Sequence, residues 1–184
     1  GTWDYEYFVY NQNVDSNVGE VSITVPANVD ISCVGFHSVE YHSGDGNGNQ
    51  NFSNDPWGVE IAGGQITWTT ETPAQNNNAN AIRWGTGYNF RFRANAAPAD
   101  APATLGIWDP NATSTLNLVV SAPSASPVAV CLEDFDLSGD VGFADLLILL
   151  GAWGMDDPAV DLDCSGDVGF SDLLVLLGAW GPCP

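Results

Sequence analysis

Apolar and polar residues alternate in several short stretches of the first 120 residues. The stretch WDYEYFVY (3–10) places Trp, Tyr, Tyr and Val on one parity and two acids on the other. The stretch YNFRF (88–92) alternates three aromatic residues with Asn and Arg in the same way. A period of two is typical of strands that bury one face. Further strand candidates are residues 20–26, 31–41, 57–62, 65–70, 103–108 and 115–120.

Clusters of Gly, Asn, Asp and Pro separate these stretches and predict turns. About eight or nine short strands without a helical pattern indicate a mainly β fold, an antiparallel Ig-like β-sandwich over residues 1–120. Residues 121–130, SAPSASPVAV, are rich in Pro, Ala and Ser, and we interpret them as a linker. Residues 131–184 follow a different pattern and are expected to form a second domain.

The second domain contains one sequence twice. Residues 134–154 and 161–181 are identical at seventeen of twenty-one positions and begin 27 residues apart. In each copy the segment DLLxLLGAW has apolar residues at helical spacing. One such helix cannot bury its apolar side alone, so we expect the two copies to pack together around a pseudo-twofold axis. The expected buried positions are Leu146, Leu147, Leu149, Leu150, Trp153, Leu173, Leu174, Leu176, Leu177 and Trp180.

The residues that lead into each helix follow the layout of a twelve-residue calcium-binding loop. Acids occupy positions 1, 3 and 12, serine position 5 and glycine position 6. Side chains at 1, 3 and 5, the carbonyl of 7 and both oxygens of the acid at 12 would surround the ion. We therefore predict two calcium ions, and a strand pair between Val141 and Val168 at position 8. The predicted ligands are Asp134, Asp136, Ser138, Asp140, Asp145, Asp161, Asp163, Ser165, Asp167 and Asp172.

The charge of the chain narrows the classes of partner. Twenty-three acids against three arginines and no lysine give a formal charge of −20, which disfavours nucleic acid and anionic lipid and favours multivalent cations. Eleven of the acids and no basic residue lie in 131–184. No apolar run is long enough for a membrane helix, so we expect no membrane insertion. The chain begins inside a strand-like stretch without a signal peptide, and we expect a processed protein that is extracellular or on the cell surface.

Cysteines and possible modification sites fit this localisation. Four cysteines are compatible with disulfides and allow three pairings. Asn51 and Asn111 each begin an Asn-x-Ser/Thr sequence and are candidate glycosylation sites. The segment 45–49 has oxygen-bearing side chains at calcium-like spacing but lacks the closing acid, and we interpret it as a solvated loop.

The duplicated loop and helix resemble a dockerin, the module by which secreted bacterial proteins bind cohesin domains. The resemblance covers residues 131–184 and rests on the repeat, on Asp at position 12 and on the missing helix before each loop. It implies a small α-helical F-hand pair, calcium-dependent folding and a cohesin-like partner. Loop positions 10 and 11, where familiar dockerins carry small hydroxyl residues, are Phe-Ala and Phe-Ser here. Residues 1–120 resemble an uncharacterised β-sandwich domain that precedes such tails in secreted bacterial proteins.

The resemblance also implies a disulfide that joins the two ends of the module. That pair would be Cys131 and Cys183, and would contribute roughly 2–4 kcal/mol. Pairing of Cys183 with Cys164 is the alternative within the module. If Cys131 pairs with Cys183, Cys33 and Cys164 would pair across domains or subunits, or stay reduced.

Catalytic motifs are sparse, and we expect the protein not to be an enzyme. His37 and His42 are five residues apart, so they would face opposite sides of one strand. No nucleophile elbow, zinc-protease or phosphate-loop motif occurs. We expect a secreted structural protein whose calcium-loaded tail binds other copies of itself, in a filament or matrix, or a cohesin-like domain. The alternative is a carbohydrate- or surface-binding module anchored to a cohesin-type scaffold, with Trp57, if exposed, as a stacking surface for sugar.

Overall fold

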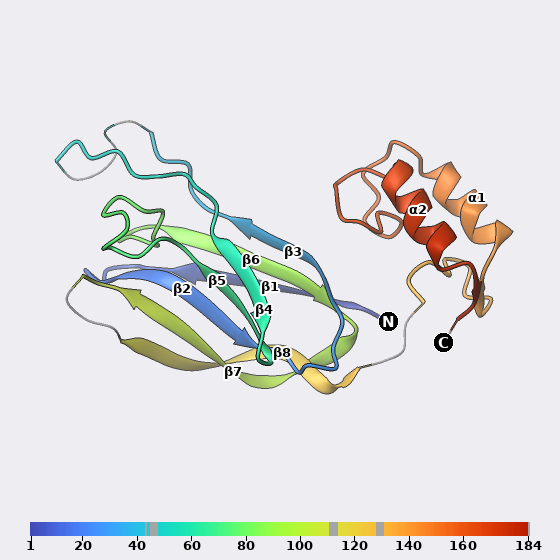
Figure 1. Cartoon of the computed structure of the whole chain (residues 1–184), viewed down its shortest axis with the longest axis horizontal. Helices are drawn as coiled ribbons and strands as arrows, with labels where there is room; N and C mark the ends of the chain where they lie inside the picture. Colours follow the sequence, from blue (N-terminus) through green and yellow to red (C-terminus); the bar gives the residue numbers. More distant parts are fainter. Residues whose placement is uncertain (43, 45–47, 111–113, 128–130, 184) are drawn as a thin grey trace. The chain divides into compact units, whose positions relative to one another are not determined.

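The computed structural model describes residues 1–42, 44, 48–110, 114–127 and 131–183, and the chain forms two compact units (Figure 1). The first unit comprises Thr2–Pro127 and the second Val128–Pro184. Asn111, one of the two candidate glycosylation sites, and residues 45–47 of the solvated loop lie outside the described residues. Asn51, the other candidate, is exposed, and its side-chain oxygen accepts a hydrogen bond from the Gly44 N–H at 2.9 Å.

The first unit is an antiparallel β-sandwich, as the alternation predicts (Figure 1). One sheet has three strands in the order β1-β6-β3, and the other has five in the order β4-β5-β2-β7-β8. Every strand pair within these two sheets is antiparallel. The strands are β1 (Trp3–Tyr10), β2 (Asn17–Thr24), β3 (Ile31–His37), β4 (Gly58–Ala62), β5 (Gln65–Thr69), β6 (Gly87–Ala94), β7 (Ala96–Trp108) and β8 (Thr115–Pro127).

Aromatic residues from both sheets form the core between them. Tyr88, Phe90 and Phe92 of β6 are buried on one parity of the strand, and Trp68 of β5 contacts Phe90 with ring centroids 5.4 Å apart. Rings of this size supply most of the buried apolar area in a small sandwich. The alternation in the sequence therefore identified the inward face of these strands correctly.

Strands β7 and β8 are longer than the sequence pattern indicates, and the predicted linker is wrong for residues 121–127. These residues form the second half of β8 and pair with the first half of β7, so that Ala122 lies opposite Ala99. Proline is tolerated because Pro98 sits at a register shift and Pro123 lies on an outer strand, where a missing N–H breaks no ladder. Residues 128–130 lie outside the described residues.

The second unit is built from two equivalent helices, and a two-stranded pairing joins its first loop to its C-terminal segment. The helices are α1 (Phe143–Gly151) and α2 (Phe170–Gly178). The short strands are β9 (Asp140–Val141) and β10 (Gly181–Pro182), which pair antiparallel.

The predicted pairing of Val141 with Val168 is wrong. Val141 lies opposite Gly181, whereas the N–H and C=O of Val168 bond to Met155 and Gly154 at 2.9 and 2.8 Å. Each position-8 valine therefore pairs with the segment that follows the helix of the other repeat. The two pairings correspond to each other because residues 154–155 and 181–182 follow the helix in their respective repeats. Both valines are buried.

The helices bury less of their apolar surface than the sequence pattern predicts. Leu149 and Leu176 are fully buried, and Leu146 and Leu173 pack partly against the same cluster. The remaining expected positions are exposed, since nine residues give only two and a half turns and one narrow contact line. We call these residues, with the two phenylalanines that begin the helices, the exposed apolar positions of the second unit: Phe143, Leu147, Leu150, Trp153, Phe170, Leu174, Leu177 and Trp180.

A disulfide joins Cys131 to Cys183, as the resemblance implies, with the Cα atoms 5.6 Å apart. It excludes the alternative pairing of Cys183 with Cys164. None of the four cysteines is free, which rules out the alternative in which Cys33 and Cys164 stay reduced. Disulfides indicate folding in an oxidising compartment. No helix in the described parts of the chain is sufficiently long and apolar to span a membrane.

Candidate metal centre

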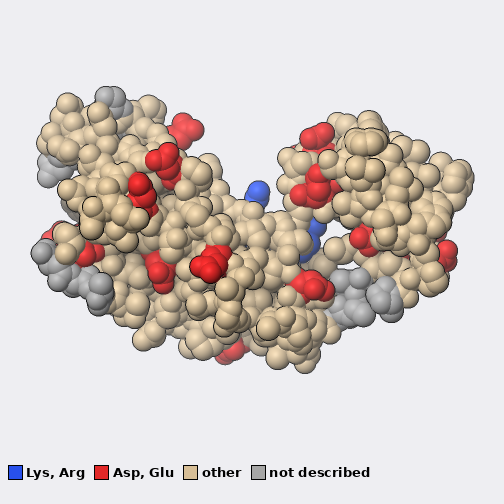
Figure 2. Space-filling model, viewed as in Figure 1, with Lys and Arg blue, Asp and Glu red and all other residues tan. Residues whose placement is uncertain are grey.

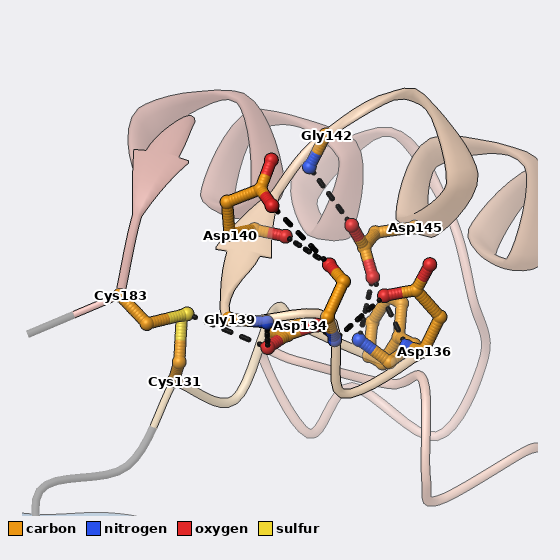
Figure 3. Close-up of a disulfide and its surroundings, with 10 residues drawn as sticks. Cys131, Asp134, Asp136, Gly139, Asp140, Gly142, Asp145 and Cys183 are labelled. Carbon is orange, nitrogen blue, oxygen red and sulfur yellow. Dashed lines mark hydrogen bonds between the residues drawn. A yellow bond between two sulfur atoms is a disulfide. The ribbon is translucent and has the colours of Figure 1, made fainter.

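Three carboxylates converge in the first loop of the second unit (Figure 3). One oxygen from each of Asp134, Asp136 and Asp145 lies within 4.8 Å of the others. The first two come from the loop before β9, and Asp145 comes from the first turn of α1. Asp134 and Asp145 are buried while Asp136 is exposed, so the cluster opens toward solvent on one side.

Asp145 closes the loop onto the start of its helix. Its Oδ2 accepts the N–H of Gly142, the residue before α1, at 2.8 Å, and its Oδ1 accepts the N–H of Phe135 at 2.7 Å (Figure 3). Burial raises the pKa of Asp145, but the donated N–H groups of Gly142, Asp136 and Phe135 outweigh it and hold the pKa below its ordinary value. The carboxylate is therefore kept ionised at the centre of the loop.

Asp134 orders the turn on the opposite side of the cluster. Its two oxygens accept the N–H groups of Ser138 and Gly139 at 3.0 and 2.9 Å. The Ser138 hydroxyl donates to the main-chain carbonyl of Asp140 at 3.1 Å, which brings the predicted ligands at positions 5 and 7 together. All five residues predicted for this site thus lie around one loop.

The second loop reproduces the first almost atom for atom. Asp161, Asp163 and Asp172 form the second cluster within 4.8 Å. Asp172 accepts the N–H groups of Leu162 and Gly169, both at 2.7 Å, and the Ser165 hydroxyl donates to the Asp167 carbonyl at 3.1 Å. A hydrogen bond from Ser165 is the largest influence on Asp163 and lowers its pKa.

The negative charge of these loops has no basic partner in the second unit. All three arginines, Arg83, Arg91 and Arg93, belong to the first unit, and residues 131–184 contain eleven acids. Acidic side chains also dominate the charged groups on the face of the molecule in Figure 2. Carboxylates this close repel one another unless a cation lies between them. The two acidic clusters could therefore hold metal ions, and their oxygen-only ligands are those of hard cations.

The backbone geometry of the loops contains features that the sequence did not reveal. Leu137 and Cys164, at position 4, have φ of 59° and 60°, in the left-handed region. Gly139 and Gly166, at position 6, also have positive φ, as the loop layout requires. Neither leucine nor cysteine signals a left-handed conformation. In the sequence, Leu137 and Cys164 are related only because they occupy the same position in the two repeats.

The disulfide lies directly beside the first loop (Figure 3). The Cys183 Sγ is 3.6 Å from an oxygen of Asp134, and the Cys183 N–H donates to the Gly139 carbonyl at 3.0 Å. The C-terminal segment is thus attached to the loop that carries the first acidic cluster. The dockerin resemblance implied the disulfide, but the sequence analysis did not predict its contact with the loop.

Comparison with known proteins adds little to this picture. No protein-family model and no curated protein matches the chain. A solved structure that matches is an uncharacterised protein from Nocardia farcinica described as having an immunoglobulin-like fold, with 15% identity. The match covers 70% of this chain and 80% of that chain, with a TM-score of 0.37. Nothing about function follows from a similarity at this level.

Proposed function

We propose that the second unit binds two calcium ions and, once loaded, attaches the chain to another protein. The observation that supports calcium most directly is the pair of equivalent loops, each with three carboxylates within 4.8 Å and no basic residue in the unit. The ligands at loop positions 1, 3, 5, 7 and 12 are those of the twelve-residue calcium loop. Magnesium is less favoured because it prefers one or two carboxylates and keeps most of its water.

Support for attachment comes from the exposed apolar positions of the second unit. Phe143 and its repeat equivalent Phe170 are 67% and 65% exposed, and Leu147 and Leu174 are 53% and 54% exposed. Apolar residues at this density on so small a unit mark a protein-binding surface. The ions fix the direction of each helix through Asp145 and Asp172, so calcium binding and presentation of these residues are coupled.

The chain as a whole is proposed to be a secreted, non-catalytic structural subunit that associates with further copies of itself. Two equivalent contact surfaces on each copy would allow assembly into a filament or matrix. A cohesin-like domain is the other partner that the repeat suggests, and it would use the same exposed positions.

The test measures association of the full chain in calcium and in excess EGTA. Sedimentation velocity and negative-stain microscopy should show assemblies larger than a dimer in calcium, and these larger assemblies should be lost in EGTA. The double variant Asp145→Asn with Asp172→Asn should lose the larger assemblies, whereas Asp100→Asn with Asp156→Asn, which changes two exposed acids outside the loops, should behave as wild type. Association that is unaffected by EGTA would contradict the proposal, and a chain that stays monomeric in calcium would exclude self-assembly and favour a cohesin-like partner.

Glycan binding is a second candidate function, but Trp57, the residue first considered as a stacking surface for sugar, does not provide one. Trp57 is buried at 4% exposure and donates from Nε1 to the Asn80 carbonyl, so it belongs to the core. Phe8 and Tyr10, on the outer face of β1, are instead exposed, with rings 6.3 Å apart and inclined by 13°. A side chain at Gly87 would overlap the Phe8 ring, so the glycine lets that ring lie flat on the sheet. Two exposed and nearly parallel rings on one face of a strand offer a candidate stacking surface for sugar.

Sedimentation of the full chain with insoluble cellulose, chitin and xylan tests this second function. Wild type should co-sediment with at least one polymer, and the double variant Phe8→Ala with Tyr10→Ala should remain in the supernatant. Val59→Ala removes an exposed apolar side chain from the other sheet and serves as the control. Failure of wild type to bind all three polymers, or equal binding by the double variant, would contradict it.

A further inference from the structure

Strand β8 is an outer strand of the five-stranded sheet, and its first half presents backbone groups away from its partner β7. The ladder with β7 places Thr115, Asn117 and Val119 opposite Gly106, Thr104 and Pro102. The Ile107 N–H donates to the Ser114 carbonyl at 2.9 Å, which fixes the alternation of the ladder. Because bonded and non-bonded pairs alternate along an antiparallel ladder, the N–H and C=O groups of Thr115, Asn117 and Val119 point outward.

In the second half of β8, other residues of the first unit already bond to backbone groups of the strand. The Ser121 carbonyl, next in the outward series, accepts the Tyr7 hydroxyl at 2.7 Å, which agrees with this alternation. The Ala125 carbonyl accepts the Asn28 side-chain N–H at 3.2 Å. Pro123 and Pro127 have no N–H to offer. In the described part of the chain, nothing bonds to the outward groups of Thr115–Val120, which we call the open edge.

The open edge lacks the devices that normally protect an outer strand. Such strands are usually short, or carry lysine or other charges that prevent edge-to-edge pairing. Residues 110–132 contain no charged side chain, although the whole chain carries a formal charge of −20. Leu116 and Val119 are 54% and 69% exposed, so apolar side chains accompany the unpaired backbone groups.

We infer that the open edge pairs antiparallel with the open edge of a second copy of this chain. A register centred on Asn117 sets Asn117 opposite Asn117 of the second copy and Thr115 opposite Val119 of the second copy. This register uses every outward group of the three residues, which gives about six hydrogen bonds. It also sets Leu116 beside Leu118 of the second copy, so that the exposed leucine is covered.

The charge pattern is what favours a second copy as the occupant. In a symmetric pair both copies present the same strand, so charges of one sign on the edge would come close to like charges of the second copy and weaken the pairing. This edge has none, and two chains of charge −20 can approach here without placing acid against acid. A strand from a different protein, or a charged polymer, would be recognised by opposite charge, and the edge offers no charge for it.

The edge pairing buries little surface, so the amount of dimer should depend on protein concentration. Six residues of strand bury far less than the about 1,200 Å² of a stable interface. Together with the calcium-dependent contact of the second unit, it would give each copy contacts at two separate places and an assembly that does not close. Only this last step rests on the proposed function; the edge pairing itself requires no calcium.

The experiment compares three full-length proteins in EGTA, which are the wild type, the variant Asn117→Lys and the control variant Gln65→Lys. Both substitutions replace an exposed amide by lysine on a strand of the same sheet, but Gln65 lies on β5, away from the open edge. Sedimentation equilibrium should show dimers of wild type and of Gln65→Lys that increase with concentration, and Asn117→Lys should reduce dimer formation at least tenfold. Hydrogen exchange at the amides of Thr115, Asn117 and Val119 should slow in the concentrated wild type.

Specific results would overturn the inference. These are a wild type that stays monomeric with unchanged exchange at the three amides, an Asn117→Lys variant that dimerises like wild type, or equal losses in both variants, which would indicate a general charge effect. Because the measurement is made in EGTA, its failure leaves the calcium-dependent association untouched. Conversely, loss of the larger, calcium-dependent assemblies in the variant Asp145→Asn with Asp172→Asn leaves the edge dimer to be measured separately.

Discussion

At the scale of single residues, the two acidic clusters were predictable and the backbone conformation that holds them was not. The acids at positions 1, 3 and 12 stand out because a hard cation needs oxygens at fixed spacing along one turn of chain. The left-handed conformation of Leu137 and Cys164 gives no such signal, since neither residue type prefers it. A loop can thus be recognised by its ligands while its strained positions stay hidden.

Leu137 supplies a prediction at this scale. Its side chain is 87% exposed and contributes little packing, whereas its φ of 59° is unfavourable for leucine. Asn tolerates this conformation, so Leu137→Asn should stabilise the second unit by about 1 kcal/mol. Thermal unfolding in calcium measures the change. Leu147→Asn, at an exposed position of α1, is the control and should give no stabilisation; an equal gain there, or a loss at Leu137, would contradict the strain argument.

At the scale of secondary-structure elements, alternation of aromatic and polar residues located the strands that bury one face. It failed for the ends of β7 and β8, because Pro, Ala and Ser have low strand preference and resemble a linker in isolation. Their pairing is decided by contacts between residues that lie far apart in the chain, such as Ala99 with Ala122. The apolar helix pattern failed differently: it identified the helices, but not how few of their leucines are covered.

Ala122 tests whether residues 121–127 belong to the sandwich. Its side chain is fully buried in the core of the first unit. Ala122→Asp would bury an unpaired charge and should lower the free energy of unfolding of the first unit by about 3–5 kcal/mol. Ser126→Asp, four residues further on at an exposed position, should change it little. Denaturant unfolding followed by tryptophan fluorescence measures both, and equal tolerance of the two substitutions would restore the linker interpretation.

At the scale of the whole molecule, the two units differ in their charge and in the size of their apolar cores. The sandwich buries a large aromatic core and contains all three arginines. The second unit has a small apolar cluster around Leu149 and Leu176 and eleven acids without a basic residue. If the proposed calcium binding is correct, we expect the stability of this unit to depend on the disulfide and on the bound ions more than on its core.

This asymmetry predicts that calcium stabilises one unit and not the other. A site that is saturated at one hundred times its Kd adds about 2.7 kcal/mol to the folded state, and two equivalent sites add about 5 kcal/mol. Calorimetry of the full chain in calcium should show two transitions, of which EGTA moves only the one that belongs to residues 131–184. The variant Asp145→Asn should remove about half of the calcium effect, because Asp172 and the second loop remain intact. If EGTA moved both transitions equally, or neither, the second unit would not be held together by calcium, and the exposed apolar positions would need another explanation.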